Sequence, residues 1–247
     1  GINATTTFTY DANGDVLSVS DPRSNVTEMT YDNNRRPLIT KHHNGNIAAA
    51  LLAAERTSYD VLGRVTSTDG GTVFSGTNIT TWQTLKTTTY TPTSKVDTEK
   101  DGANDVTDYD YDSLDRILQV TDPVSRRTRF DYDLAGQKLK EIRGYGMPLQ
   151  QDYATYTYSN NGQVLTVKDA NNNLSTYEYD GVDRLSKLRF PLPTLGANAS
   201  STTDYEQYDY DPNGNRISLR KRDGQTILYS YDRLNRETVK DLPSGTT

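Results

Sequence analysis

The 247-residue sequence contains no cysteine and only two histidines. The lack of cysteine excludes a disulfide framework, a thiolate zinc site and a cysteine nucleophile. The two histidines are adjacent, in Lys41-His42-His43-Asn44-Gly45, a segment that predicts a turn at the protein surface. They have no identifiable nucleophile or metal partner, so we expect no catalytic, cofactor or metal site.

Apolar residues are also scarce. Hydrophobic types make up 33% of the chain, and the mean hydropathy is −0.81. No apolar run approaches the roughly 18 residues that span a membrane, so we expect no membrane insertion. The net charge of −6, with no basic run, argues against nucleic acid as the main partner. Eighteen tyrosines, against four phenylalanines, partly fill the apolar deficit and indicate a folded chain with an unusual interior.

What the sequence does contain is a repeat. A Tyr-Asp pair, or a close variant of it, occurs ten times, and five of the nine separations are 21 residues. The other separations equal 21 residues plus an insertion, which is typical of tandem repeats. The anchor tyrosines of the ten repeats are Tyr10, Tyr31, Tyr59, Tyr90, Tyr111, Tyr132, Tyr158, Tyr179, Tyr210 and Tyr231.

Each repeat predicts a strand, a turn and a second strand. The residues before the anchor alternate between strand formers, mainly Thr and Tyr, and seven anchors have an aromatic residue two positions earlier, on the same strand face. The Asp after the anchor can accept a hydrogen bond from its own backbone two residues on. The fourth residue after the anchor is of a type that tolerates positive φ, as a bulged hairpin requires, at Gly14, Gly63, Gly136, Gly162, Gly214, Asp115, Asp183 and Asn235.

The predicted fold class is therefore all-β, with a single array of hairpin repeats over residues 1–247. Insertions fall near residues 41–58, 66–89, 144–154 and 190–204. Within the first insertion, Ala48 to Ala54 is rich in Ala and Leu and predicts the one helix of the chain. A single sheet has both faces at least partly wet. We therefore expect the anchor rings in rows on one face, with their hydroxyls reaching water or a neighbour.

The unit Tyr59-Asp60-Val61-Leu62-Gly63-Arg64-Val65, and its close match at residues 10–16, resemble the YD repeat of the Rhs family. That family includes Rhs polymorphic toxins, the B and C components of insecticidal toxin complexes, wall-associated proteins and animal teneurins. The resemblance implies tandem hairpins in a curved single-layer sheet, as a spiral strip or shell segment. The family's shells are far longer, so it also implies that the chain is a fragment of one. We find no match to the self-cleavage segment that often ends bacterial shells, and we do not expect self-cleavage.

The sequence is compatible with three functions. The resemblance implies a non-catalytic structural segment of a secreted or cell-surface protein, and favours a bacterial over an animal source. Its partners would be the remainder of its own shell or an enclosed toxin region. The alternative is a carbohydrate-binding or adhesion module that recognises cell-surface glycans through the insertions. The third function is degradation of polysaccharide, but no pair of carboxylates stands out for it.

The candidates for ligand contact are the aromatic residues that the repeat does not require, namely Trp82, Tyr145, Tyr153 and Phe190. The anchor tyrosines predict cross-strand packing, with stacking on sugars as the alternative. A basic residue follows the turn in six repeats, as a partner of a turn Asp or a neighbouring Tyr, or as a stripe for an acidic glycan: Arg36, Arg64, Lys95, Arg116, Arg184 and Arg236. The acidic stretch Asp101 to Asp105, with Asp108, predicts a solvated turn, with calcium binding as the alternative.

Overall fold

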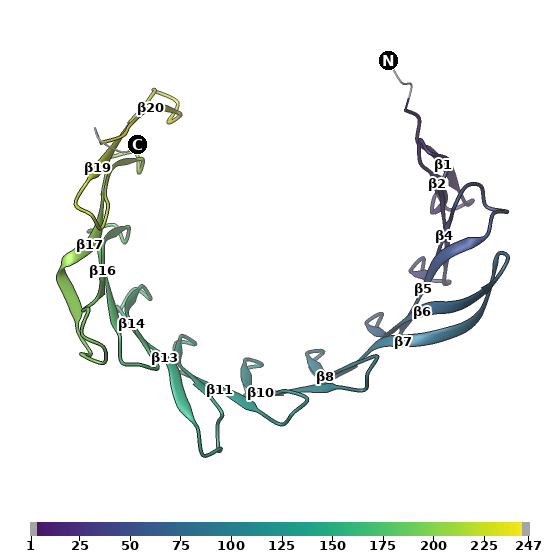
Figure 1. Ribbon diagram of the computed structural model, residues 1–247, viewed down its shortest axis with the longest axis horizontal. Coiled ribbons are helices and arrows are strands. Elements are labelled where there is room, and N and C mark those ends of the chain that lie inside the picture. The colour runs from purple at the N-terminus through teal and green to yellow at the C-terminus, as the bar shows by residue number, and fades with distance from the viewer. Residues whose placement is uncertain (1–3, 244–247) are drawn as a thin grey trace. The chain divides into compact units, whose positions relative to one another are not determined.

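The computed structural model describes residues 4–243. Its backbone is built from β-strands and tight turns, and no helix forms between these residues. None of the described chain is therefore a helix that could cross a membrane. The chain divides into two compact units, residues 1–125 and residues 126–247, whose strands follow one another in the order of the sequence (Figure 1).

The first unit is a strip of antiparallel strands. Each strand pairs with the next one along the chain, from β1–β2 to β9–β10. The strands described for this unit are β1 (Thr7–Tyr10), β2 (Val16–Ser20), β3 (Val26–Tyr31), β4 (Pro37–His43), β5 (Leu51–Tyr59), β6 (Val65–Ser75), β7 (Asn78–Tyr90), β8 (Val96–Asp101), β9 (Val106–Tyr111) and β10 (Ile117–Thr121).

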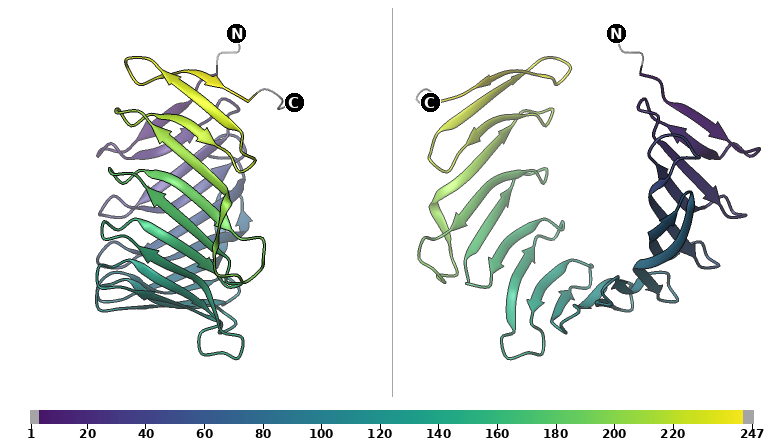
Figure 2. Two further views of the ribbon diagram at one scale, coloured as in Figure 1. Left: turned by 90° about the vertical axis from the view of Figure 1, so that its left-hand side faces the viewer. Right: turned by 45° about the vertical axis from the view of Figure 1, so that its right-hand side comes forward.

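The second unit repeats this plan. Its strands again pair with their sequence neighbours, from β11–β12 to β19–β20, and Figure 2 shows the successive hairpins. The strands described here are β11 (Arg127–Tyr132), β12 (Lys138–Arg143), β13 (Gln151–Tyr158), β14 (Val164–Asp169), β15 (Leu174–Tyr179), β16 (Leu185–Pro191), β17 (Ser200–Tyr210), β18 (Arg216–Arg220), β19 (Thr226–Tyr231) and β20 (Glu237–Asp241). The all-β prediction of tandem hairpins is confirmed.

The turn after each anchor follows the predicted chemistry. In the third repeat the Asp60 amide donates to the Arg64 carbonyl at 2.9 Å, and the Gly63 amide donates to the Asp60 carbonyl at 3.0 Å. The Asp60 carboxylate also accepts the amides of Leu62 and Arg64, each at 2.9 Å. Aspartate is thus the side chain that closes the loop, because one of its oxygens satisfies two backbone donors that the strand ladder leaves free.

The fourth residue after the anchor has positive φ, as predicted. Gly63 has φ 85°, and the non-glycine residues Asp115, Asp183 and Asn235 have φ values of 59° to 64°. Two repeats use a residue that the sequence pattern did not indicate, Arg35 at φ 63° and Ser94 at φ 67°. The strand register shifts at the anchor of every hairpin in the described chain. The bulge that a residue in this conformation produces is therefore a constant part of the repeat.

The anchors of each unit share one face of its strip. In the first unit Glu55 pairs with Thr40, and Lys86 pairs with Thr68. Paired residues lie on the same face, and so does every second residue along a strand, so successive anchors lie on one face. The same tracing holds along the second unit. The prediction of anchor rings in rows on one face is confirmed within each unit.

Few side chains are fully enclosed. The buried apolar residues among those described are Leu51, Ala54, Ile142, Ala154 and Tyr229. Four of them lie in or beside the first and third insertions, and Tyr229 is the aromatic residue two positions before the anchor Tyr231, with Arg216 over its ring. The low share of hydrophobic residues, 33%, therefore agrees with a single sheet that encloses few side chains.

Two predictions for the first insertion are wrong. Residues 48–54 form no helix, because Leu51 begins strand β5, on which Leu51 and Ala54 are buried. His43 does not lie at the surface, since it ends strand β4 and is 1% exposed. Local Ala and Leu propensity is overridden here because a strand extends the sheet and a helix would not.

Candidate functional site

The anchor tyrosine joins one repeat to the repeat before it. The hydroxyl of Tyr31 donates to the Val16 carbonyl at 2.8 Å, and Val16 is the residue that pairs with the preceding anchor, Tyr10. The same bond recurs, at 2.7 to 3.0 Å, from Tyr59, Tyr90, Tyr111, Tyr158, Tyr179, Tyr210 and Tyr231 to the carbonyls of Pro37, Val65, Val96, Lys138, Val164, Leu185 and Arg216. We call this the anchor hydrogen bond. It connects the first strand of one hairpin to the neighbouring last strand of the hairpin before it, so it adds a side-chain bond to the backbone pairing between successive hairpins.

The arginine after the turn joins the repeat to the one that follows. The Arg36 guanidinium pairs with Asp32 of its own turn at 2.5 Å and lies 4.5 Å from the ring centroid of the next anchor, Tyr59. Equivalent stacking brings Arg64 over Tyr90 at 4.5 Å. The own-turn ion pair, at 2.6 to 2.7 Å, also forms in the repeats of Arg64, Arg116, Arg184 and Arg236.

These arginines therefore act within the array, as the pairing interpretation predicts. Arg184 stacks on Tyr210 at 4.6 Å and also donates to the Asp211 carbonyl of the next turn at 3.2 Å. In the variant repeat at Tyr90, Thr91 stands in place of aspartate, and its hydroxyl accepts the Lys95 amide at 3.1 Å. The Arg36 guanidinium, through its hydrogen bond, lowers the pKa of the Asp32 carboxyl below its usual range. That carboxylate stays charged in its role as a turn acceptor.

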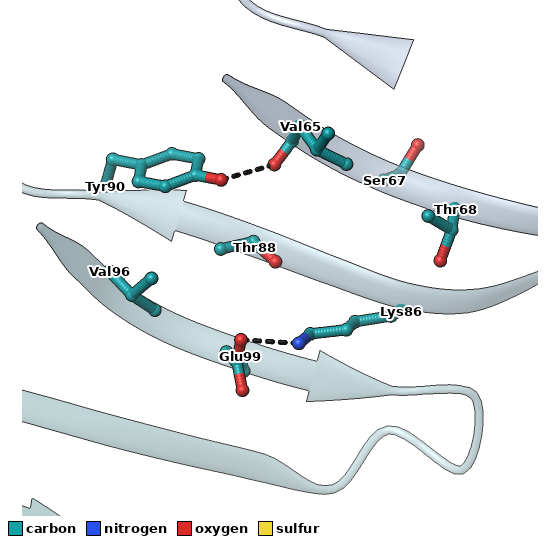
Figure 3. Close-up of a pocket in the computed structure, with 8 residues that line it drawn as sticks. All are labelled: Val65, Ser67, Thr68, Lys86, Thr88, Tyr90, Val96 and Glu99. Atoms are coloured by element: carbon teal, nitrogen blue, oxygen red, sulfur yellow. Dashed lines mark hydrogen bonds and ion pairs between the residues drawn. The ribbon is translucent and has the colours of Figure 1, made fainter. Parts of the chain in front are cut away.

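A shallow hollow lies on the anchor face of strands β6, β7 and β8. Its volume is about 260 Å³, and Figure 3 shows Tyr90 at one end, with its hydroxyl on the Val65 carbonyl at 2.7 Å. The ion pair between Lys86 and Glu99, at 2.5 Å, crosses the other end. Its lining residues are Val65, Ser67, Thr68, Lys86, Thr88, Tyr90, Val96 and Glu99. The two charged side chains that line the hollow, Lys86 and Glu99, pair with each other, and the hydroxyl of its tyrosine is already bonded.

The second insertion forms a long hairpin with a buried carboxylate. Asp69 on β6 is 4% exposed; it accepts two bonds from Arg56, at 2.9 and 3.0 Å, and one from the Thr84 hydroxyl at 2.7 Å. The Arg56 guanidinium in turn lies 4.8 Å from the centroid of Trp82. A buried carboxylate needs such partners. They could not be predicted from the sequence, because Arg56 and Thr84 lie on different strands.

Each ligand-contact candidate has an arginine on its ring. Trp82 is paired with Arg56 as described, and in the second unit Arg129 lies 4.9 Å from the ring centroid of Tyr145. The other two pairs are Arg143 with Tyr153 at 3.2 Å and Arg222 with Phe190 at 3.9 Å. Cation–π contact occupies one face of each ring. Ligand contact at these four residues stays a prediction.

The acidic stretch at residues 101–105 forms a repeat-type turn. The Asp101 carboxylate accepts the amides of Ala103 and Asp105 at 2.8 and 3.0 Å, and Asn104 has φ 72°. Among the described residues no group of three or more His, Asp or Glu side chains is arranged to hold a metal ion. The hairpin turn accounts for the acidic residues of this stretch.

The repeated geometry is matched by a sequence family. The model of the RHS Repeat matches residues 10–46, 111–146, 155–192 and 210–247, together more than half of the chain. The chain belongs to the RHS Repeat family. The RHS match leaves out residues 47–110, which contain the long β6–β7 hairpin. No curated protein sequence matches this RHS chain.

Solved structures share the fold of the RHS chain. The crystal structure of TcdB2-TccC3 matches with a TM-score of 0.56 at 18% identity, over 95% of this chain and 14% of that one. The complex TcdB2-TccC3-Cdc42 matches with the same values. The Photorhabdus luminescens Tc holotoxin pore matches with a TM-score of 0.54 at 19% identity, over 94% of this chain and 13% of that one. The RHS chain therefore spans about one-seventh of the length of these structures.

Proposed function

We propose that the chain is a non-catalytic wall segment of a secreted or cell-surface bacterial toxin-type protein. In this proposal residues 1–247 form one RHS array that belongs to a longer shell, and the shell encloses a toxin region. The partners are then the remainder of the same shell and the enclosed region. The RHS Repeat match and the fold shared with Tc toxin chains support this proposal.

The observation that carries the proposal is the use of the repeat's polar side chains. In repeat after repeat the tyrosine hydroxyl bonds to the previous hairpin, the aspartate closes the turn and the arginine stacks on the next tyrosine. Residue types that often serve as catalytic or binding groups are here held by neighbouring repeats. When the same side chain contacts the neighbouring repeat in each unit, the repeats stack into an extended surface.

The carbohydrate alternative has weaker support. Sugar rings stack on exposed aromatic faces, but an arginine already lies on one face of Trp82, Tyr145, Tyr153 and Phe190. Five of the six basic residues that could form a stripe for an acidic glycan, all of them arginines, are paired with turn aspartates. We therefore keep glycan binding as an outcome of the test and do not develop it as a second proposal.

Protease protection in the parent polypeptide tests the proposal. The region outside the repeats should resist a protease concentration that digests the same region when it is produced alone. Replacement of the anchors Tyr158 and Tyr179 by alanine should open the wall and abolish that protection.

The matched control replaces Tyr156 and Tyr177, which lie on the same strands, by phenylalanine, and should preserve the protection. Equal digestion of this region in the parent polypeptide and when it is produced alone would overturn enclosure. Saturable binding of the 247-residue chain to a glycan array, lost on replacement of Trp82, would support the alternative.

A further inference from the structure

His43 is the most deeply buried large side chain among the described residues, at 1% exposure. It ends strand β4, where it pairs with Val26 on β3 and with Leu51 on β5. Its side chain lies on the face opposite the anchor tyrosines, together with Glu28 and Lys41. The repeat does not require a histidine at this position, so its burial calls for a separate explanation.

Both ring nitrogens of His43 face an acceptor. Nδ1 lies 3.0 Å from the carbonyl oxygen of Ala49, in the connection between β4 and β5. Nε2 lies 3.5 Å from a carboxylate oxygen of Glu28 and is a buried atom without a hydrogen-bond partner in the described structure. A carbonyl oxygen and a carboxylate can only accept, so the surroundings present two acceptors to one ring.

A neutral imidazole cannot satisfy this arrangement. It carries one N–H, so one nitrogen donates while the other directs its lone pair at an oxygen. If Nδ1 carries the proton, the Nε2 lone pair faces the charged Glu28. If Nε2 carries it, the Nδ1 lone pair faces the Ala49 carbonyl at hydrogen-bond distance. The imidazolium has two N–H donors and is the form that suits both contacts.

We propose that Glu28, His43 and Ala49 form a proton-dependent clasp. With a proton on both nitrogens, His43 donates to the Ala49 carbonyl and to the Glu28 carboxylate. It then fastens the β4–β5 connection, residues 44–50, to strand β3. Loss of the proton leaves one repulsive contact and loosens that connection. The clasp closes as the pH falls, because acid favours the ring form with two N–H donors.

The other groups around the clasp define its charge balance. Lys41 lies 3.3 Å from the same Glu28 oxygen, so its ammonium opposes the second positive charge while Glu28 favours it. Strand β5 contributes the apolar residues Leu51 and Ala54. Further along this face, Arg56 and Asp69 are paired with each other. His42 projects to the other face, where its Nδ1 lies 3.2 Å from the Thr27 hydroxyl.

Nuclear magnetic resonance can read the protonation state directly, because the chain has two histidines. In the His42→Gln variant a single imidazole remains. Its two nitrogen signals should have the imidazolium pattern at about pH 5.5 and should show a hydrogen bond at each N–H. A neutral-ring pattern at that pH would overturn the proposal.

Hydrogen exchange tests the consequence for the connection. The amides of Ala49 and Leu51, which donate to the Asn46 and Gly76 carbonyls, should exchange about tenfold more slowly at about pH 5.5 than at about pH 8, after correction for intrinsic rates. The variant Glu28→Gln should lose this dependence, because its amide can donate to a neutral Nε2. Retention of the wild-type dependence in Glu28→Gln would also overturn the clasp.

The matched control is Glu55→Gln, since Glu55 lies on β5 on the opposite face. This variant should keep the wild-type dependence of the Ala49 and Leu51 amides on pH. The readouts concern one connection in the first unit, so they succeed or fail independently of any role of the chain in a shell.

Discussion

At the residue scale, the array depends on tyrosine rather than on aromatic character in general. Phenylalanine would fill the same space between strands, but the anchor hydrogen bond needs the hydroxyl. The acceptor is a backbone carbonyl on the neighbouring strand, which is the last strand of the preceding hairpin, as for Tyr179 on β15 and Val164 on β14. The composition, with eighteen tyrosines and four phenylalanines, follows from this geometry.

Replacement of Tyr179 by phenylalanine measures the bond. The ring remains, so the change removes only the hydroxyl that donates to the Val164 carbonyl. We expect a loss of about 1 kcal/mol in the free energy of local opening, measured by hydrogen exchange of the amides in β14 and β15. Tyr177→Phe on the same strand is the control and should change that free energy by much less. Equal effects of the two substitutions would contradict the assigned bond.

The residues of the turn could be predicted from the sequence, but the partner of Tyr59 and the surroundings of His43 could not. Asp60 and Gly63 were predictable because they act on backbone atoms within four residues of themselves. The partner of Tyr59 was not, since Pro37 contributes a backbone oxygen from 22 residues away, which leaves no trace in a side-chain pattern. His43 was misplaced for a similar reason, because the atoms that surround it come from β3 and from the β4–β5 connection.

At the element scale, a hairpin of this array is defined by its bulged turn. The residue before the end of the turn has a left-handed backbone, which an L side chain adopts at a cost of about 1–2 kcal/mol. Asn and Asp tolerate this conformation better than other residues. Gly14 has φ 86°, and a Cβ added there would meet nothing within 4 Å. Any effect of a side chain at Gly14 therefore comes from the backbone alone.

The substitution Gly14→Ala isolates this backbone term. We expect it to destabilise the β1–β2 hairpin by about 1 kcal/mol or more, measured as faster hydrogen exchange in β2. Gly181→Ala is the control, because Gly181 also has open space around its Cβ but is not in the left-handed region. That variant should be neutral or slightly more stable. A neutral Gly14→Ala would show that the turn tolerates another conformation.

The insertion at β5 shows where local sequence reasoning fails for an element. The Ala and Leu residues of 48–54 have high helix propensity, but the neighbouring strand β6 provides an edge on which β5 continues the sheet. Small residues are needed there: a Cβ on Gly71 would lie 2.9 Å from the Phe74 ring and 3.3 Å from the Ala54 Cβ. Ala54 is thus small because three strands meet closely, a reason that the sequence does not reveal.

At the scale of the whole molecule, cohesion is distributed evenly along the chain. Strands pair with their sequence neighbours, and the anchor hydrogen bonds add ties between successive hairpins. Such arrays behave as sums of repeat and interface terms, so a single unfolding transition is not the natural description of them. Substitutions in one hairpin should act mainly on that hairpin and its neighbours.

Alkaline pH should act on many repeats at once. Burial raises the pKa of the anchors Tyr111, Tyr158 and Tyr179, and burial together with the nearby Glu206 raises that of Tyr208. The folded chain therefore holds these protons to higher pH than the unfolded chain does. The contribution of these tyrosines to the free energy of unfolding should be constant below about pH 10, the usual tyrosine value, and should fall as the pH rises above it.

Phenolate absorbance followed together with circular dichroism checks this expectation. The buried tyrosines should ionise late, and their ionisation should coincide with loss of strand signal. Complete ionisation of all tyrosines with the strand signal intact would contradict the assigned role of the anchor hydroxyls.

The acceptor of the anchor hydrogen bond has a consequence for how such chains change over generations. Since the bond ends on a backbone carbonyl, the residue that supplies it can be Val16, Pro37, Lys138 or Arg216. A hairpin can then be duplicated, deleted or exchanged between genes without a compensating mutation in its new neighbour. The geometry thus permits an array to gain or lose one repeat at a time, because a newly joined hairpin brings its own hydroxyl donor and meets a backbone acceptor.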